Sequence, residues 1–237
     1  MSQRFAFIFP GQGSQTVGMG ADVYHASPAA RAVFAVADDA LGFALSRLCF
    51  DGPEAALRET LNTQPALVAT SLALLAALQE AAASAGVADA AMAPEAARAT
   101  GDLAEPLRPG YLAGHSVGEY AALAAAGALN VAETLRLARE RGRLMSQEGA
   151  NCPSGMAAIL GMDAAALEPI CVEATAQARG ELGDAADQAD THPGAGRVVI
   201  ANDNAPGQVV ISGASRALEL AMELAKARGA KRAVPLA

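Results

Sequence analysis

The chain has 237 residues, of which 52% are hydrophobic, and a formal net charge of −8. This length allows one large or two modest domains with a sizeable core. An acidic chain without basic runs argues against a nucleic-acid partner. The longest apolar stretches, 66–78 and 120–129, are shorter than the ~20 residues of a membrane span. The apolar run 5–9 is too short for a signal-peptide core. We therefore expect no membrane anchor, no secretion signal and no nucleic-acid binding.

Cysteine and histidine are scarce. The three cysteines, Cys49, Cys152 and Cys171, are widely spaced and form no C-x-x-C pair. The sequence also has only 3 histidines, so few metal ligands are available. This composition predicts a reduced, cytoplasmic protein without a disulfide framework or a metal site.

The first part of the chain alternates short strands with alanine-rich helices. Pro65 suits the first turn of a helix, with Asn62 or Thr63 as its cap. Residues Ala85–Pro109 have no clear period and are predicted to be an irregular insertion. The remaining predicted elements are a strand over Arg4–Phe9, helices over Pro28–Ala40 and Pro65–Ala83, a strand over Tyr111–Ala113, and helices over Val117–Leu129 and Val131–Gln147.

The second part is predicted to have the order β-α-β-β-α-β, which is typical of the ferredoxin-like split βαβ pattern. We place a domain boundary near Gly149–Pro153 and a solvated loop over Gly180–Gly196. Asp163 is predicted to cap the first helix, and Gly229 to close the second. The predicted elements are a strand over Gly155–Leu160, a helix over Ala164–Ala178, strands over Arg197–Ala201 and Gln208–Ser212 joined by a turn over 204–207, a helix over Ala214–Arg228, and a strand over Lys231–Leu236.

Gly114-His115-Ser116-Val117-Gly118 matches the G-x-S-x-G elbow, a sharp turn between a strand and a helix that exposes a nucleophilic serine. The amide of Val117 and the positive end of the following helix can stabilise an oxyanion. A tight structural turn between strand and helix is the alternative. The side chain of His115 points away from its neighbour Ser116, so we expect a structural or gate-lining histidine rather than the general base.

Two further polar positions could belong to the same site. The loop Gly11-Gln12-Gly13-Ser14-Gln15 follows the first strand, and its Gln12 amide could be the second oxyanion donor. An ordinary glycine turn explains this loop equally well. Gln64 precedes a predicted helix, where a polar residue is more often simply a cap.

Arg141 falls on the apolar face of its predicted helix, where a guanidinium needs an anionic partner. The helix returns antiparallel to the one that leaves the elbow. At 1.5 Å per residue, Arg141 therefore lies at roughly the level of Val117–Gly118. There it could bind a substrate carboxylate in a bidentate manner. The alternative is an internal salt bridge to a core Asp or Glu.

Taken in order, these motifs resemble the malonyl-CoA:acyl-carrier-protein transacylases and the acyltransferase domains of polyketide synthases. The resemblance covers the chain except for Ala85–Pro109 and Gly180–Gly196. It implies an α/β-hydrolase-like large domain, of which residues 1–150 are the N-terminal part and the C-terminal remainder is absent, carrying an inserted ferredoxin-like small domain, here residues 151–237. The matching segments are Phe9-Pro10-Gly11-Gln12-Gly13-Ser14-Gln15, Thr63-Gln64-Pro65-Ala66-Leu67, Gly114-His115-Ser116-Val117-Gly118-Glu119-Tyr120, Arg141-Gly142 with Met145, and Asn202-Asp203-Asn204-Ala205-Pro206-Gly207-Gln208-Val209-Val210-Ile211-Ser212-Gly213.

The resemblance also implies roles for individual residues. Ser116 would be the acylated nucleophile and Arg141 the clamp for the malonyl carboxylate. The amides of Gln12 and Val117 would form the oxyanion hole, while Gln64 and His115 would line the substrate site. The serine would take malonyl from malonyl-CoA and pass it to the phosphopantetheine thiol of acyl carrier protein, in fatty-acid or polyketide synthesis. This chemistry needs no metal or redox cofactor, and we expect a monomer.

One expected group has no counterpart in the sequence. The family's catalytic histidine follows the last strand of the small domain, whereas this chain stops at Pro235-Leu236-Ala237. We therefore expect an N-terminal portion, roughly three quarters, of a longer family member, with its general base beyond Ala237. The 237-residue chain alone is then expected to be nearly inactive. A serine hydrolase that uses the same elbow, or an inactive fragment, remains the alternative.

Overall fold

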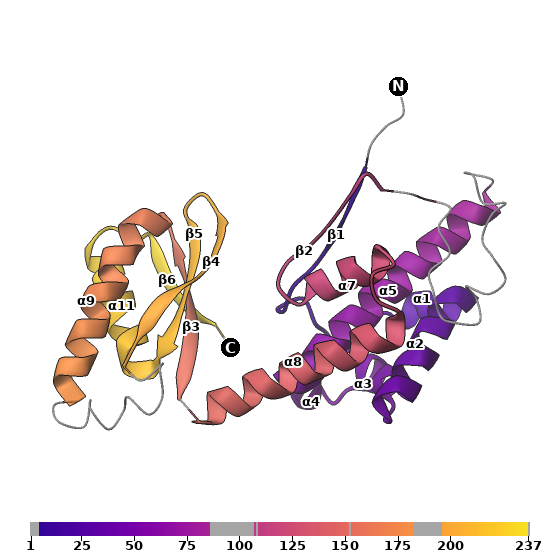
Figure 1. Ribbon diagram of the computed structural model, residues 1–237, viewed down its shortest axis with the longest axis horizontal. Helices are drawn as coiled ribbons and strands as arrows, with labels where there is room; N and C mark the ends of the chain where they lie inside the picture. Colours follow the sequence, from indigo (N-terminus) through magenta and orange to yellow (C-terminus); the bar gives the residue numbers. More distant parts are fainter. Residues whose placement is uncertain (1–4, 86–106, 108, 152, 183–195, 237) are drawn as a thin grey trace. The chain divides into compact units, whose positions relative to one another are not determined.

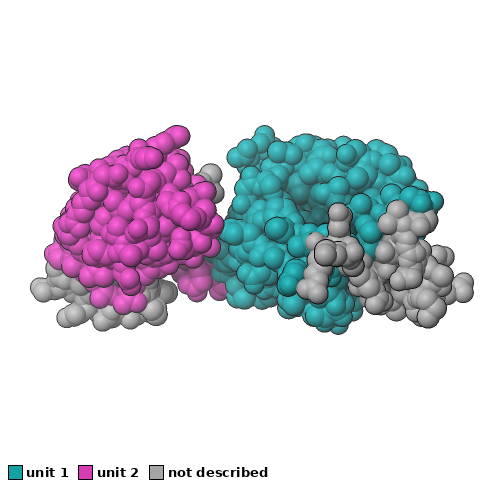
Figure 2. All heavy atoms as spheres, turned by 90° about the horizontal axis from the view of Figure 1, so that it is seen from above, with its two compact units in different colours: residues 1–146 teal, residues 147–237 magenta. Residues whose placement is uncertain are grey.

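A computed structural model describes residues 5–85, 107, 109–151, 153–182 and 196–236. It has a mixed α/β fold divided into two compact units, Met1–Ser146 and Gln147–Ala237, which Figure 2 shows in different colours. Each unit has its own hydrophobic core. The division falls inside a single long helix, α8, so this helix belongs to both units. Most of the predicted insertion 85–109, most of the predicted loop 180–196, Cys152 and His192 lie outside the described residues.

The first unit is largely helical, and its two strands form a parallel pair in which Phe9 lies opposite Gly114 (Figure 1). Because both strands end at the same edge, the segments that follow them begin side by side. Its elements are β1 (Ala6–Phe9), α1 (Ala21–Ala26), α2 (Pro28–Leu41), α3 (Leu45–Asp51), α4 (Glu54–Arg58), α5 (Thr60–Ser84), β2 (Tyr111–Gly114), α7 (Gly118–Ala125) and α8 (Val131–Asn151).

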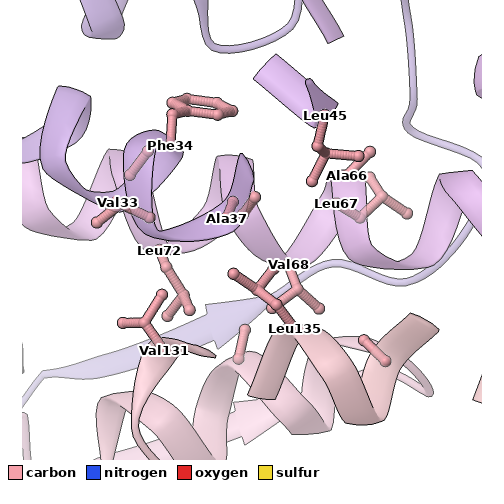
Figure 3. Packing of buried hydrophobic residues seen from close by; sticks show 14 of the residues in the cluster. Val33, Phe34, Ala37, Leu45, Ala66, Leu67, Val68, Leu72, Val131 and Leu135 are labelled. Atoms are coloured by element: carbon pink, nitrogen blue, oxygen red, sulfur yellow. The ribbon is translucent and has the colours of Figure 1, made fainter. Parts of the chain in front are cut away.

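Helix α5 forms the centre of this unit. Apolar side chains of α2, α3 and α8 share one core with it, among them Phe34, Leu45 and Leu135 (Figure 3). By length and composition alone α5 could cross a membrane, but 61% of its most apolar window is buried inside the unit. This burial is typical of the core helix of a globular unit.

Two helix ends in the first unit differ from the prediction. Helix α5 begins at Thr60, because the carbonyl of Glu59 accepts the amides of both Asn62 and Thr63 at 2.8 Å and so closes a turn before Pro65. Pro65 therefore lies inside the helix, and neither Asn62 nor Thr63 is a cap. Helix α7 ends at Ala125 rather than Leu129, because Gly127 adopts a left-handed φ of 72° that stops the helix.

The second unit has the predicted order β-α-β-β-α-β. Its four strands lie in the order β4-β5-β3-β6, and all neighbours are antiparallel. Alternate residues of β3 and β5 are buried in one core with the two helices. The elements are β3 (Ser154–Leu160), α9 (Ala164–Leu182), β4 (Val198–Ala205), β5 (Gln208–Ala214), α11 (Ser215–Ala227) and β6 (Arg232–Leu236).

Local contacts confirm one predicted helix cap in this unit and move two boundaries. Asp163 Oδ1 accepts the amide of Ala166 at 2.8 Å, so it caps α9 as predicted. Helix α9 continues to Leu182, so the segment 180–182 is helical rather than part of a loop. Strand β4 extends to Ala205, which shortens the predicted turn to Pro206-Gly207, where Gly207 has a φ of 74°.

Candidate active site

The segment between β2 and α7 is a sharp turn with Ser116 at its apex. Ser116 has a φ of 54°. Among the described residues it is the single non-glycine residue with a positive φ. This left-handed conformation is uncommon for a residue with a side chain and is often found at functional turns. The strand, the strained serine and the helix together form the geometry that the G-x-S-x-G pattern predicts.

The two glycines of the pattern are required by close backbone packing. A Cβ placed on Gly114 would lie 2.1 Å from the carbonyl carbon of Gly118. A Cβ placed on Gly118 would lie 2.4 Å from the carbonyl oxygen of Phe9, at the end of β1. Any side chain at either position would therefore push α7 away from the strands. The elbow brings the first turn of α7 directly against the end of β1.

Backbone hydrogen bonds hold this turn and leave one amide available. The amides of His115, Gly118 and Glu119 donate to the carbonyls of Phe9, His115 and Ser116 at 3.0, 2.9 and 3.1 Å. The amide of Val117 donates to no acceptor within the described part of the chain. It follows Ser116 directly at the start of α7, where a free amide can stabilise negative charge.

The glycine loop after β1 touches the elbow. A Cβ on Gly11 would lie 2.4 Å from Nδ1 of His115, so these two segments are in close contact. The amide of Gly13 donates to Oε1 of Gln15 at 2.8 Å, which folds the loop back on itself. Across the residues that the structure describes, the Gln12 amide has no acceptor. Both amides predicted for an oxyanion hole therefore lie in segments that meet beside Ser116.

Arg141 reaches Ser116 from helix α8. Its Nη2 donates to Ser116 Oγ at 2.9 Å and its Nη1 donates to Gln64 Oε1 at 2.7 Å. This contact confirms the prediction that Arg141 lies on α8 beside the start of α7. The alternative of an internal salt bridge is not seen, because no carboxylate among the described residues pairs with Arg141. The partners that the structure describes for the guanidinium, Gln64 and Ser116, are both neutral, so it can accept an anion beside the serine.

Gln64 is completely buried, with 0% of its surface exposed. Its Oε1 accepts from Arg141, and its Nε2 donates to Met145 Sδ at 3.2 Å. The interpretation of Gln64 as a helix cap is wrong, because α5 begins four residues earlier. Sequence reasoning missed Met145 as the partner of Gln64. Its position four residues after Arg141, on the same face of α8, was the available signal.

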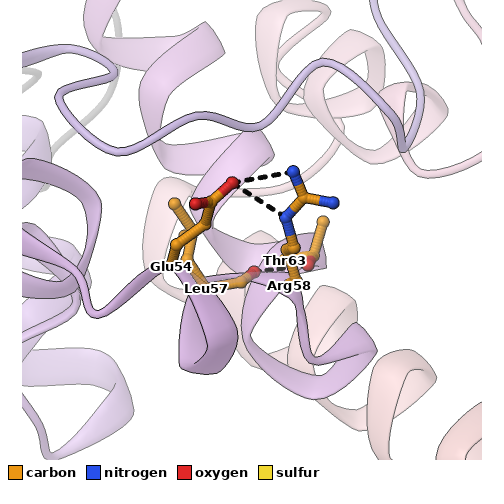
Figure 4. Close-up of polar contacts among 4 residues, drawn as sticks. All are labelled: Glu54, Leu57, Arg58 and Thr63. Atoms are coloured by element: carbon orange, nitrogen blue, oxygen red, sulfur yellow. Dashed lines mark hydrogen bonds and ion pairs between the residues drawn. The ribbon is translucent and has the colours of Figure 1, made fainter. Parts of the chain in front are cut away.

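The helix turn that carries Gln64 is anchored by its neighbours (Figure 4). The buried hydroxyl of Thr63 donates to the carbonyl of Leu57 in α4 at 2.5 Å. Within α4, Arg58 pairs with Glu54 at 2.7 Å. The Thr63 hydrogen bond ties the short helix α4 to the first turn of α5, directly beside Gln64.

The buried cysteines Cys49 and Cys171 are poor nucleophiles. Burial raises the pKa of the Cys49 thiol to about 12 and that of Cys171 to about 11. Both thiols therefore stay protonated and unreactive near neutral pH. Among the described residues, no group of three His, Cys, Asp or Glu side chains is arranged to hold a metal ion.

Comparison with known families places this serine site in a class of group-transfer enzymes. The family described as the acyl transferase domain matches residues 6–96 and 93–236, nearly the whole sequence. The chain belongs to this family. The malonyl CoA-acyl carrier protein transacylase of Bacillus subtilis (strain 168) is 41% identical over 233 residues, which cover 98% of the chain and 61% of the relative. The protein with the same name from Escherichia coli (strain K12) is 39% identical, with coverage of 98% and 62%.

Solved structures of malonyltransferases are also similar to this chain. The acyl-carrier-protein S-malonyltransferase of Burkholderia pseudomallei 1710b has a TM-score of 0.76 and 37% identity, covering 99% of this chain and 62% of its own. A malonyl-transacylase in complex with a type II polyketide synthase acyl-carrier protein has a TM-score of 0.76 and 36% identity, with coverage of 99% and 63%. The chain spans about 61% of the length of the curated relatives, less than the three quarters expected.

Proposed function

We propose that the protein is a malonyltransferase that moves malonyl from malonyl-CoA to the phosphopantetheine thiol of acyl carrier protein. The observation that carries this proposal is the hydrogen bond that Arg141 donates to Ser116 Oγ at 2.9 Å. Among the described residues, this guanidinium has no carboxylate partner. A serine beside a cation whose described partners are neutral suits an acyl group that ends in a carboxylate. The names of the relatives, which are malonyl CoA-acyl carrier protein transacylases, support the same substrates.

The reaction takes two acyl transfers through Ser116. In the first, Oγ bonds to the thioester carbon of malonyl-CoA while its proton passes to a general base. The C–S bond then breaks, and the proton goes to the CoA sulfur. In the second, the carrier thiol gives its proton to the base and its sulfur attacks the serine ester. The C–O bond breaks and Oγ regains a proton. The base is expected to be a histidine beyond Ala237.

The other site residues stabilise the negative charges of the reacting acyl group and position the side chain of Arg141. The amides of Gln12 and Val117 donate to the oxyanion of each tetrahedral intermediate. Arg141 leaves Ser116 Oγ to bind the malonyl carboxylate, and Gln64 holds the guanidinium from its other side. His115, packed on Gly11 at the rim of the elbow, lines the entrance for substrate. These assignments require no metal or redox cofactor.

The finer fold description belongs to the same proposal. The element order and strand order of the second unit suit a ferredoxin-like domain over 151–237. The parallel strands and serine elbow of the first unit suit the catalytic α/β-hydrolase-like domain over 1–150. We further propose that the protein acts as a cytoplasmic monomer in fatty-acid or polyketide synthesis.

Labelling with malonyl-CoA tests this function. The complete protein that carries this sequence is incubated with labelled malonyl-CoA, and the label is located on the intact protein by mass spectrometry. Label is expected on Ser116 and lost in Ser116→Ala, whereas Ser146→Ala, an exposed serine on α8, retains it. Undiminished label in Ser116→Ala would refute the assignment. Rapid hydrolysis of neutral esters without transfer to acyl carrier protein would favour the serine hydrolase alternative.

A further inference from the structure

Gly142 lies where helix α8 crosses the first turn of α5. A Cβ placed on Gly142 would lie 2.7 Å from the carbonyl oxygen of Thr60 and 3.0 Å from Cα of Leu61. Both neighbours are backbone atoms, so no flexible side chain can move aside. Gly142 is buried in a regular helix and has no positive φ. Because glycine is a poor helix former, the close approach is what requires it here.

This crossing point lies among the polar contacts that hold Arg141. Gln64 accepts from Arg141 at 2.7 Å and donates to Met145 at 3.2 Å. Thr60 and Gln64 are four residues apart, on successive turns of one face of α5. The spacing between the helices at Gly142 therefore sets how far Arg141 must reach to Gln64 and to the serine.

We propose that Gly142 is a positioning residue for acyl-group selectivity, acting through Arg141. Its missing side chain lets α8 approach α5 closely enough for the guanidinium to contact Ser116 Oγ and Gln64 together. This inference rests on the proposed malonyl transfer. A carboxylate bound by two parallel hydrogen bonds demands accurate placement of the guanidinium. A neutral acyl group such as acetyl makes no such demand.

The size of the effect follows from the geometry. An added methyl group at 2.7 Å must move out to at least 3.4 Å, where ordinary contacts begin, which is a shift of about 0.7 Å. Misplacement of a substrate-binding group by about 1 Å can cost ~10²-fold in rate. We expect Gly142→Ala to lower kcat/KM for malonyl-CoA by ~10- to 100-fold and to change that for acetyl-CoA by less than about 3-fold.

The matched control is Gly149→Ala on the same helix. A Cβ on Gly149 meets nothing within 4 Å, so this change brings the same gain in helix propensity without a clash. The control should leave the malonyl-to-acetyl ratio unchanged. Both variants are made in the complete protein that carries this sequence, and thermal unfolding confirms that each is folded.

A double-mutant cycle with Arg141→Ala tests whether Gly142 acts through the guanidinium. In the Arg141→Ala background, Gly142→Ala should cause no further loss with malonyl-CoA, because the positioned group is gone. Equal losses for both acyl donors, or additive losses in the cycle, would overturn the proposal. If Gly142→Ala does not fold, it is repeated in the Gly149→Ala background. Failure to fold there as well would assign Gly142 to stability and overturn the proposal too.

The outcome also separates this inference from the function on which it rests. If the unmodified protein transfers no malonyl, the proposed function fails. If it transfers malonyl and Gly142→Ala keeps the malonyl-to-acetyl ratio, only the role of Gly142 is refuted.

Discussion

Replacing Gln64 with glutamate tests whether the charge of Arg141 is available to the substrate. The change keeps the size of the side chain and places a carboxylate at the position of Oε1, 2.7 Å from Arg141 Nη1. Although the site is fully buried, the adjacent guanidinium favours the ionised form of the new carboxyl group. The cation would then have a permanent internal partner.

The expected loss follows from like-charge repulsion. A malonyl carboxylate on the far edge of the guanidinium would lie about 6 Å from the new carboxylate, since a hydrogen-bond length separates each of them from the guanidinium. At an effective dielectric constant of about 20, two like charges at that distance repel by about 3 kcal/mol. This energy corresponds to ~10²-fold in rate. We therefore expect Gln64→Glu to lower kcat/KM for malonyl-CoA ~10²-fold, whereas acetyl-CoA, which has no carboxylate, should change only a few-fold.

The assay measures transfer from each acyl donor to acyl carrier protein by the complete protein. Gln79→Glu is the matched control, because Gln79 is also buried on α5 but pairs with the backbone of Leu107, at 2.9 and 3.2 Å, rather than with Arg141. In the control, any loss should be the same for both donors. If Gln64→Glu lowers transfer from both donors equally, or leaves malonyl transfer unchanged, the assigned role of Arg141 is refuted.

Two further predictions concern Arg141 and Cys49. Arg141→Ala should lower malonyl transfer ~10²-fold or more, because removing one partner of a hydrogen-bonded charge pair costs ~2–5 kcal/mol. Acetyl transfer, measured in the same assay, should fall much less, and equal losses would indicate a structural role. Because burial raises the pKa of Cys49 from 9.0 to about 12, the folded state holds this proton more tightly than the unfolded state. Stability should therefore be insensitive to this thiol below pH 9 and fall between pH 9 and 12, as denaturant titrations can show. Cys49→Ala should reduce that fall, and an unchanged pH profile would contradict the assigned burial effect.

Sequence reasoning found the elements with strong local signals. The strand before Ser116 and the glycines on either side were visible because a sharp turn demands small residues at fixed spacing. The order of strands and helices after residue 153 followed from hydrophobic periodicity and turn residues in the same way. The position of Arg141 beside the elbow follows from the rise per residue of a helix and from the short connection between two helices. Both can be read from the local sequence.

Other features do not follow from the isolated signals of proline position and helix propensity. The sequence predicts Gln64 to be a cap, because Pro65 in isolation indicates the start of a helix. The carbonyl of Glu59 starts α5 earlier, and the fold then buries Gln64 against Met145. The end of α7 was misplaced because alanine-rich sequence continues a helix by propensity, while Gly127 stops it with a left-handed turn.

Local sequence patterns suffice to predict a serine elbow, an arginine on an apolar helix face and a β-α-β-β-α-β second unit. The folded chain was needed to see that, among the described residues, Arg141 pairs with Ser116 and Gln64 and not with a core carboxylate. It also revealed Gly142 as the point of close approach between α5 and α8. This difference arises because propensity and periodicity act over a few residues, whereas the partner of a buried charge is set by helices that meet only when the chain has folded.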